Sequence, residues 1–78
     1  MKTSHSILIF IDSFISNNGF SPTVREIGKG TYLSSTSSVW RHLDRLKQRK
    51  MISFVRQSPR TITITEKGKE LLEKLNSS

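Results

Sequence analysis

The sequence predicts an α+β fold, in which three helices are followed by a two-stranded antiparallel hairpin and a fourth helix. Three observations predict it. Apolar residues recur with the 3.6-residue period of a helix in the first 49 residues, with a period of two between residues 52 and 64, and again with the helical period near the C-terminus. We expect residues 1–78 to form a single small domain, because a chain of this length supplies one modest core.

The first helix is expected over residues 4–17. Thr3 or Ser4 can cap its N-terminus, and Gly19 or Asn18 can take the left-handed conformation that ends a helix. Its apolar residues follow the spacing of one buried stripe: Ile7, Phe10, Ile11, Phe14 and Ile15. This stripe could form a groove for a partner, but a core position is favoured because the other helices need a surface on which to pack.

Two short helices are expected over residues 23–30 and 35–49. Thr23 is a good N-cap for the first of them, and Glu26 follows it at the capping-box spacing. In the second, an apolar stripe is formed by Val39, Leu43 and Leu46, whereas the opposite face is polar and mostly basic. Two helices joined by so short a segment must cross at a steep angle, which is the helix-turn-helix arrangement.

The hairpin strands are expected over residues 52–56 and 61–65, on either side of a turn at residues 57–59. An isolated hairpin is marginal in water, so its alternating apolar residues should pack on the helices: Ile52, Phe54, Ile62 and Ile64.

The last helix is expected over residues 66–75, with Thr65 as its cap and a frayed tail after it. Gly68 is expected to weaken its first turn by about 1 kcal/mol relative to Ala. Leu71, Leu72 and Leu75 can pack inward or form a dimer seam, and packing on the first helix is favoured.

Composition excludes several classes of protein. The absence of cysteine excludes disulfides and thiolate metal sites. The longest apolar run, residues 7–11, is far shorter than the roughly 20 residues of a membrane span. No signal peptide is evident, which favours the cytoplasm. The acidic residues are scattered, and His5 and His42 are far apart. We therefore expect a protein that is not an enzyme and has no cofactor, metal site, small-molecule ligand or membrane partner; His42 is interpreted as a structural residue.

Positive charge is concentrated in one part of the chain. The net charge is +7, and residues 41–60 contain seven Lys and Arg residues against Asp44 alone, which gives a local charge of +6. A basic run can simply be a solvated face. Combined with a helix-turn-helix pattern, it indicates a surface that binds the phosphates of double-stranded DNA.

The complete order of elements is that of a winged helix-turn-helix, and residues 19–64 resemble a known family. The stretch GFSPTVREIG at residues 19–28 is similar to the N-terminal DNA-binding domain of the LexA repressor family, particularly its Gram-positive form. Further matches follow without a gap at Leu33, Ser35, Ser37, Val39, His42, Leu43, Arg45, Leu46, Ile52, Pro59, Arg60, Ile62 and Ile64. The chain departs from the pattern at Tyr32 and Lys50, where the family has Gly, so each turn either accepts backbone strain or changes its geometry.

The resemblance implies that the helix over residues 35–49 reads bases in the major groove. The matching base-reading positions are Ser35, Ser37, Ser38, Trp40 and Arg41. An Arg such as Arg41 can bind the O6 and N7 acceptors of guanine. Trp40 can instead be partly buried, stack on a backbone sugar or contact a protein partner. Trp40 and Arg41 are unusual at these positions, so the family's operator is not transferred to this chain.

Phosphate contacts are expected from the N-terminus of the second helix, from the basic third helix and from the hairpin. The candidates are Thr23, Arg25, Arg45, Arg49, Arg56 and Arg60. Arg56 and Arg60 flank the hairpin turn, where edge protection of a small sheet is the alternative role.

Two hypotheses for the function follow. In the first, the protein is a small transcriptional repressor of bacterial or phage origin that binds specific DNA sequences, with homodimers on paired half-sites to raise its affinity. In the second, it is a winged-helix module for protein interaction, such as an anti-repressor or a replication accessory factor, with Trp40 as an anchor. The self-cleaving dimerisation domain of the LexA family has no counterpart here, so autoproteolysis is not expected.

Overall fold

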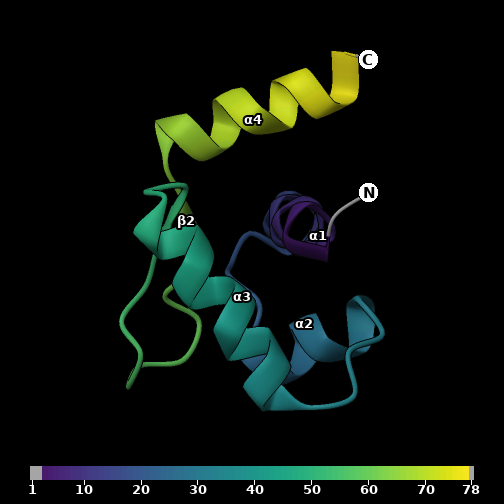
Figure 1. The fold of residues 1–78 in the computed structure, drawn as a ribbon, viewed down its shortest axis with the longest axis vertical. Coiled ribbons are helices and arrows are strands. Elements are labelled where there is room, and N and C mark those ends of the chain that lie inside the picture. The colour runs from purple at the N-terminus through teal and green to yellow at the C-terminus, as the bar shows by residue number, and fades with distance from the viewer. Residues whose placement is uncertain (1–2, 78) are drawn as a thin grey trace.

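The computed structural model describes residues 3–77, which form a winged helix-turn-helix. The elements in chain order are α1 (Thr3–Asn18), α2 (Val24–Gly30), α3 (Thr36–Gln48), β1 (Ile52–Ser53), β2 (Thr63–Ile64) and α4 (Glu66–Ser77). Figure 1 shows α3 running beside the hairpin, with α2 at one end of the molecule and α4 at the other. The predicted order of helices and strands is confirmed. Within the described residues, no helix has the length and apolar character needed to cross a membrane.

The core lies where α1, α2 and α3 meet and extends under the hairpin to α4. Its buried residues are Ile7, Leu8, Ile11, Ile27, Val39, Leu43, Leu46, Ile52, Phe54, Ile62 and Leu72. Part of the α1 stripe is therefore core, and Phe10 and Ile15 pack at its edge. Leu8 lies outside the predicted stripe but is fully buried. Leu72 is buried and Leu71 packs against the core, so these two leucines face inward.

The helix ends explain how the chain tolerates two departures from the expected glycines. Gly19 ends α1 with φ 79°, as predicted, whereas Tyr32 after α2 has φ 61° and Lys50 after α3 has φ 63°. Both turns therefore keep the left-handed conformation and accept its cost, which is of the order of 1 kcal/mol for a side chain larger than glycine. The N–H of Leu33 donates to the Gly28 carbonyl and that of Met51 to the Leu46 carbonyl, each at 3.0 Å. These bonds satisfy carbonyls at the helix ends.

The predicted strands over residues 52–56 and 61–65 are too long. The ladder holds only two residue pairs, Ile52 with Ile64 and Ser53 with Thr63. Beyond them, the Thr61 hydroxyl accepts from the Val55 N–H at 2.9 Å and donates to the Val55 carbonyl at 3.1 Å, so a side chain replaces the ladder. Arg60 has φ 59°, which is incompatible with a strand. We call residues 52–64 the wing.

Both ends of the described chain also differ from the expectation. Helix α1 begins at Thr3, so neither Thr3 nor Ser4 precedes it as a cap; Ser4 is buried instead, and its Oγ lies 3.2 Å from His42 Nδ1 in a hydrogen bond between α1 and α3. Helix α4 continues to Ser77 through part of the expected frayed tail, and Ser78 lies outside the described residues. The predicted cap of α4 is confirmed, because the Gly68 N–H donates to Thr65 Oγ1 at 3.2 Å.

Gly68 has a packing role that its helix propensity conceals. The glycine is buried, and a Cβ placed on it would meet the Met51 carbonyl oxygen and the Ile64 side chain. The Thr65 hydroxyl donates to the Lys50 carbonyl at 2.6 Å, which holds the start of α4 against the same backbone. Gly68 is therefore required for the close approach of α4 to the chain that leaves α3.

We expect Gly68→Ala to lower the free energy of unfolding by about 1 to 3 kcal/mol, because the methyl group overpacks this contact. Helix propensity alone predicts a gain of about 1 kcal/mol, so the two effects differ in sign. Urea denaturation followed by circular dichroism measures the change. Lys67→Ala, at the exposed neighbouring position, is the control and should stay within about 0.5 kcal/mol of the wild type. A stabilised Gly68→Ala variant would contradict the packing role.

Candidate nucleic-acid interface

The N-terminal turn of α3 presents hydroxyl groups to solvent. Ser35 is the N-cap, and its Oγ accepts a hydrogen bond from the Ser38 N–H at 3.3 Å. The Ser35 hydroxyl also donates to Ser38 Oγ at 3.2 Å. Ser37 is exposed beside them. Ser35 and Ser38 thus stabilise the start of the helix, and the three serines form a small polar surface at this end.

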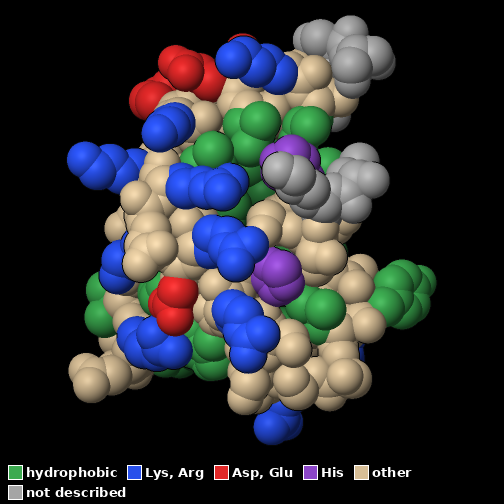
Figure 2. Space-filling model, in the orientation of Figure 1, with side chains coloured by type: hydrophobic (Ala, Val, Ile, Leu, Met, Phe, Trp, Pro, Cys, Tyr) green, Lys and Arg blue, Asp and Glu red, His purple; other side chains and the backbone are tan. Residues whose placement is uncertain are grey.

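The remaining exposed face of α3 is basic. Because Val39, Leu43 and Leu46 are buried, the helix must turn Arg41 and Arg45 toward solvent. Arg49 is exposed at the C-terminal end of α3. Figure 2 shows Lys and Arg side chains gathered in a column over this helix. Within residues 3–77, the structure records no ion pair for Arg41, Arg45, Arg49 or Arg25, which is exposed in the first turn of α2.

Trp40 does not share this open position. It is half-buried, and its ring packs on Phe54 of the wing with 5.6 Å between centroids. The Arg56 guanidinium lies over the indole at 4.4 Å from the ring centroid. The same guanidinium donates to both carboxylate oxygens of Asp44, at 3.0 and 3.1 Å. Of the alternatives for Trp40, the structure shows partial burial against the wing.

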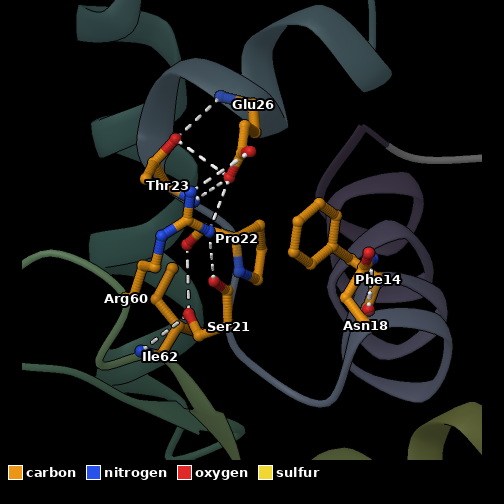
Figure 3. Close-up of polar contacts among 8 residues, drawn as sticks. All are labelled: Phe14, Asn18, Ser21, Pro22, Thr23, Glu26, Arg60 and Ile62. Atoms are coloured by element: carbon orange, nitrogen blue, oxygen red, sulfur yellow. Dashed lines mark hydrogen bonds and ion pairs between the residues drawn. The ribbon is translucent and has the colours of Figure 1, made fainter.

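A second set of contacts joins the wing to the start of α2 (Figure 3). Arg60 donates from one terminal nitrogen to the Ser21 carbonyl and to Glu26 Oε1, each at 3.0 Å, and from the other to Glu26 Oε2 at 3.4 Å. Its guanidinium also lies 4.9 Å from the centroid of the Phe20 ring. The Ser21 hydroxyl accepts from the buried Ile62 N–H at 3.1 Å.

The predicted capping box of α2 is confirmed, and it uses the polar groups of Thr23. The Thr23 N–H donates to Glu26 Oε1 at 2.8 Å, and the Thr23 hydroxyl oxygen accepts from the Glu26 N–H at 3.2 Å. The Thr23 hydroxyl also lies 3.2 Å from Glu26 Oε1, to which it donates. Glu26 therefore serves both the cap and the ion pair with Arg60.

Lys47 is a further cation with an internal role. Its Nζ donates to the Phe54 carbonyl at 3.1 Å and lies 4.5 Å from the centroid of the Phe54 ring. With Arg56 and Arg60, this makes three of the seven cations in residues 41–60 that contact groups of the protein itself. These contacts could not be predicted from the sequence, since their partners lie 7 to 39 residues away.

The comparison with known families agrees with this arrangement. The model of the LexA DNA binding domain matches residues 2–61, which include α2, α3 and most of the wing. The chain belongs to the LexA DNA-binding domain family.

Relatives of this LexA-family chain come from Gram-positive lactic bacteria. The LexA repressor of Ligilactobacillus salivarius (strain UCC118) is 45% identical over 74 residues, which cover 95% of this chain and 36% of the relative. The LexA repressor of Oenococcus oeni (strain ATCC BAA-331 / PSU-1) is 48% identical over 62 residues, or 80% of this chain and 29% of the relative. The chain thus spans about a third of the length of these relatives.

Acid should weaken the fold of this LexA-family domain through Glu26. The Thr23 backbone hydrogen bond, with help from Arg60, lowers the pKa of the Glu26 carboxyl below its ordinary value. The unfolded chain therefore binds the proton more readily. The resulting stability is fully present above the unfolded pKa, which is about 4.3, and is lost as the pH falls through the lower folded pKa.

We expect the contribution of Glu26 to leave the urea concentration at the unfolding midpoint almost unchanged between pH 7 and about 5.5. When the pH is lowered below about 4, the loss of this contribution should lower that urea concentration. Glu26→Gln keeps the hydrogen-bonding pattern of the capping box and removes the titrating group. Its midpoint should therefore fall less steeply in acid than that of the wild type. Equal acid sensitivity in both proteins would show that Glu26 does not contribute.

Proposed function

We propose that this chain binds specific sequences in double-stranded DNA and acts in transcriptional repression. The observation that carries the proposal is the exposed face of α3, where Arg41 and Arg45 lie opposite a fully buried apolar stripe. Membership of the LexA DNA-binding domain family supports it, as do relatives named LexA repressor. Binding to DNA, without a catalytic step, is the activity that we propose for these residues.

The N-terminal half of α3 would enter the major groove. Arg41 is the strongest candidate for base reading, because an exposed guanidinium can donate two hydrogen bonds to guanine O6 and N7. The hydroxyls of Ser35, Ser37 and Ser38 can donate to or accept from base edges at the end of the helix. Trp40 would contribute only the part of its ring that Phe54 and Arg56 leave uncovered.

Phosphate contacts would come from the cations that lack an internal ion pair in the described chain. Arg45 lies on α3, Arg49 caps the C-terminal end of α3, and Arg25 lies at the start of α2. Thr23 is a weaker candidate than the sequence indicated, because its hydroxyl proton and its N–H are both directed to Glu26. Such contacts fix the position of the protein on the duplex without reading its sequence.

A single copy offers a small interface with DNA, so we propose that two copies bind paired half-sites. Two-fold symmetry in the bound DNA, with half-sites about one helical turn apart or a multiple of it, would support this arrangement.

We expect a selection from a random duplex library to enrich one motif at two salt concentrations, because base contacts survive when phosphate contacts are weakened. Arg41→Ala should then cost about 1 to 3 kcal/mol on the enriched duplex and relax the preference at one base position. Binding without sequence preference that collapses with salt would contradict the proposal and favour the protein-interaction hypothesis.

Arg45→Ala is the matched comparison, since it removes the same charge from the same exposed face. We expect it to weaken binding to all duplexes by a similar factor and to reduce the slope of log affinity against log salt by about 0.9. Titrations by fluorescence anisotropy at four salt concentrations give this slope. A base-specific loss in Arg45→Ala would reverse the roles of the two arginines.

A further inference from the structure

The two arginines of the wing are held by sets of contacts with the same construction. Arg56 lies over the Trp40 ring and pairs with Asp44, both on α3. We call these three residues the α3 clamp. Arg60 likewise lies over the Phe20 ring and pairs with Glu26 of α2. Arg60, Phe20 and Glu26 form the α2 clamp, of which Figure 3 shows the polar half.

We infer that Arg56 and Arg60 are positioning residues, which support DNA binding by holding the wing against α2 and α3 and not by contacting phosphates. This inference rests on the proposed function. It differs from the sequence-based expectation for both residues, which assigned them to the phosphates because they are basic and flank the hairpin turn.

The wing needs such support because its own sheet is short. Only two residue pairs form the ladder, so the segment between Phe54 and Ile62 is held mainly by side chains. The left-handed backbone of Arg60 is strained for a side chain larger than glycine and persists only when its surroundings hold it. The bonds from Arg60 to the Ser21 carbonyl and to Glu26 supply that constraint from outside the wing.

Charge balance also argues against phosphate binding by these arginines. A guanidinium paired with a carboxylate adds no net charge to the surface, and the carboxylate repels a phosphate that approaches the same nitrogen atoms. A DNA phosphate at Arg56 Nη1 would compete with Asp44, which accepts two hydrogen bonds from that atom, and one at the terminal nitrogens of Arg60 would compete with Glu26. Arg25, Arg45 and Arg49 offer exposed guanidinium groups without this competition.

Removing the carboxylates separates the two roles by the sign of the effect. If Arg56 and Arg60 bind phosphates, Asp44→Asn and Glu26→Gln free them and tighten DNA binding. If the arginines position the wing, each variant loosens a clamp, and we expect affinity for the selected duplex to fall about two- to fivefold, the size of an exposed ion pair. The net charge rises by one in both variants, so simple electrostatics cannot produce the loss.

Glu70→Gln is the matched control, because it makes the same change of charge at an exposed position on α4. Its affinity should equal or slightly exceed that of the wild type. Arg60→Gln should weaken binding by a similar factor at every salt concentration and keep the wild-type salt slope, unlike Arg45→Ala. Unchanged or tighter binding by Asp44→Asn and Glu26→Gln, or a reduced salt slope in Arg60→Gln, would overturn the inference.

A measurement without DNA distinguishes failure of the clamps from failure of the proposed function. Trp40 is the only tryptophan, so the fluorescence of the chain reports the α3 clamp directly. Asp44→Asn and Arg56→Gln should both shift the Trp40 emission, whereas Glu70→Gln should not. If wild-type protein binds no duplex selectively, the proposed function fails. The α3 clamp is then overturned only if these two variants also leave the Trp40 emission unchanged.

Discussion

Burial of one stripe of α3 is the constraint on which the rest of the structure depends. Val39 and Leu43 are fully buried and Leu46 is nearly so, against α1 and α2. Each such side chain stabilises the fold by roughly 1.5 to 3 kcal/mol, so rotation of the helix about its axis would be costly. The side chains opposite the stripe must therefore face solvent, and the same packing that builds the core also presents Arg41 and Arg45 as a fixed surface.

The positive charge available to a ligand is smaller than the total suggests. Lys47 donates to the Phe54 carbonyl, Arg56 donates to Asp44, and Arg60 donates to Glu26 and to the Ser21 carbonyl. The basic surface is thus divided into cations that hold the wing in place and cations on α2 and α3 that remain open. The proposed DNA-binding surface is therefore a helix with exposed arginines. Beside it lies a wing that contacts α2 through Arg60 and α3 through Arg56.

The wing illustrates how side chains can replace a β-ladder. Thr61 closes the segment beyond the two ladder pairs, Ser21 accepts from the buried Ile62 N–H, and Arg60 joins the same region to α2. The Thr61 and Ser21 contacts satisfy backbone groups of Val55 and Ile62 that a longer hairpin would have paired by backbone alone. The Arg60 contact reaches Glu26 of α2, and Arg56 pairs with Asp44 of α3, so side chains join the wing to both helices of the helix-turn-helix.

The order of the elements, the capping box of Thr23 and Glu26, the left-handed Gly19 and most of the core were predictable from the sequence, because each depends on short-range periodicity or on residues within one turn. The resemblance at residues 19–64 also indicated the family that the comparison confirmed. The length of the strands, the close approach at Gly68 and the burial of Leu8 and Ser4 were not predictable, because they depend on groups far away in the chain. The partners of Arg56 and Arg60 were decided only by the tertiary structure, which brings together side chains 12 and 34 residues apart. Sequence shows how much charge the chain carries, whereas only the folded arrangement decides which charges neutralise one another and which remain open to a ligand.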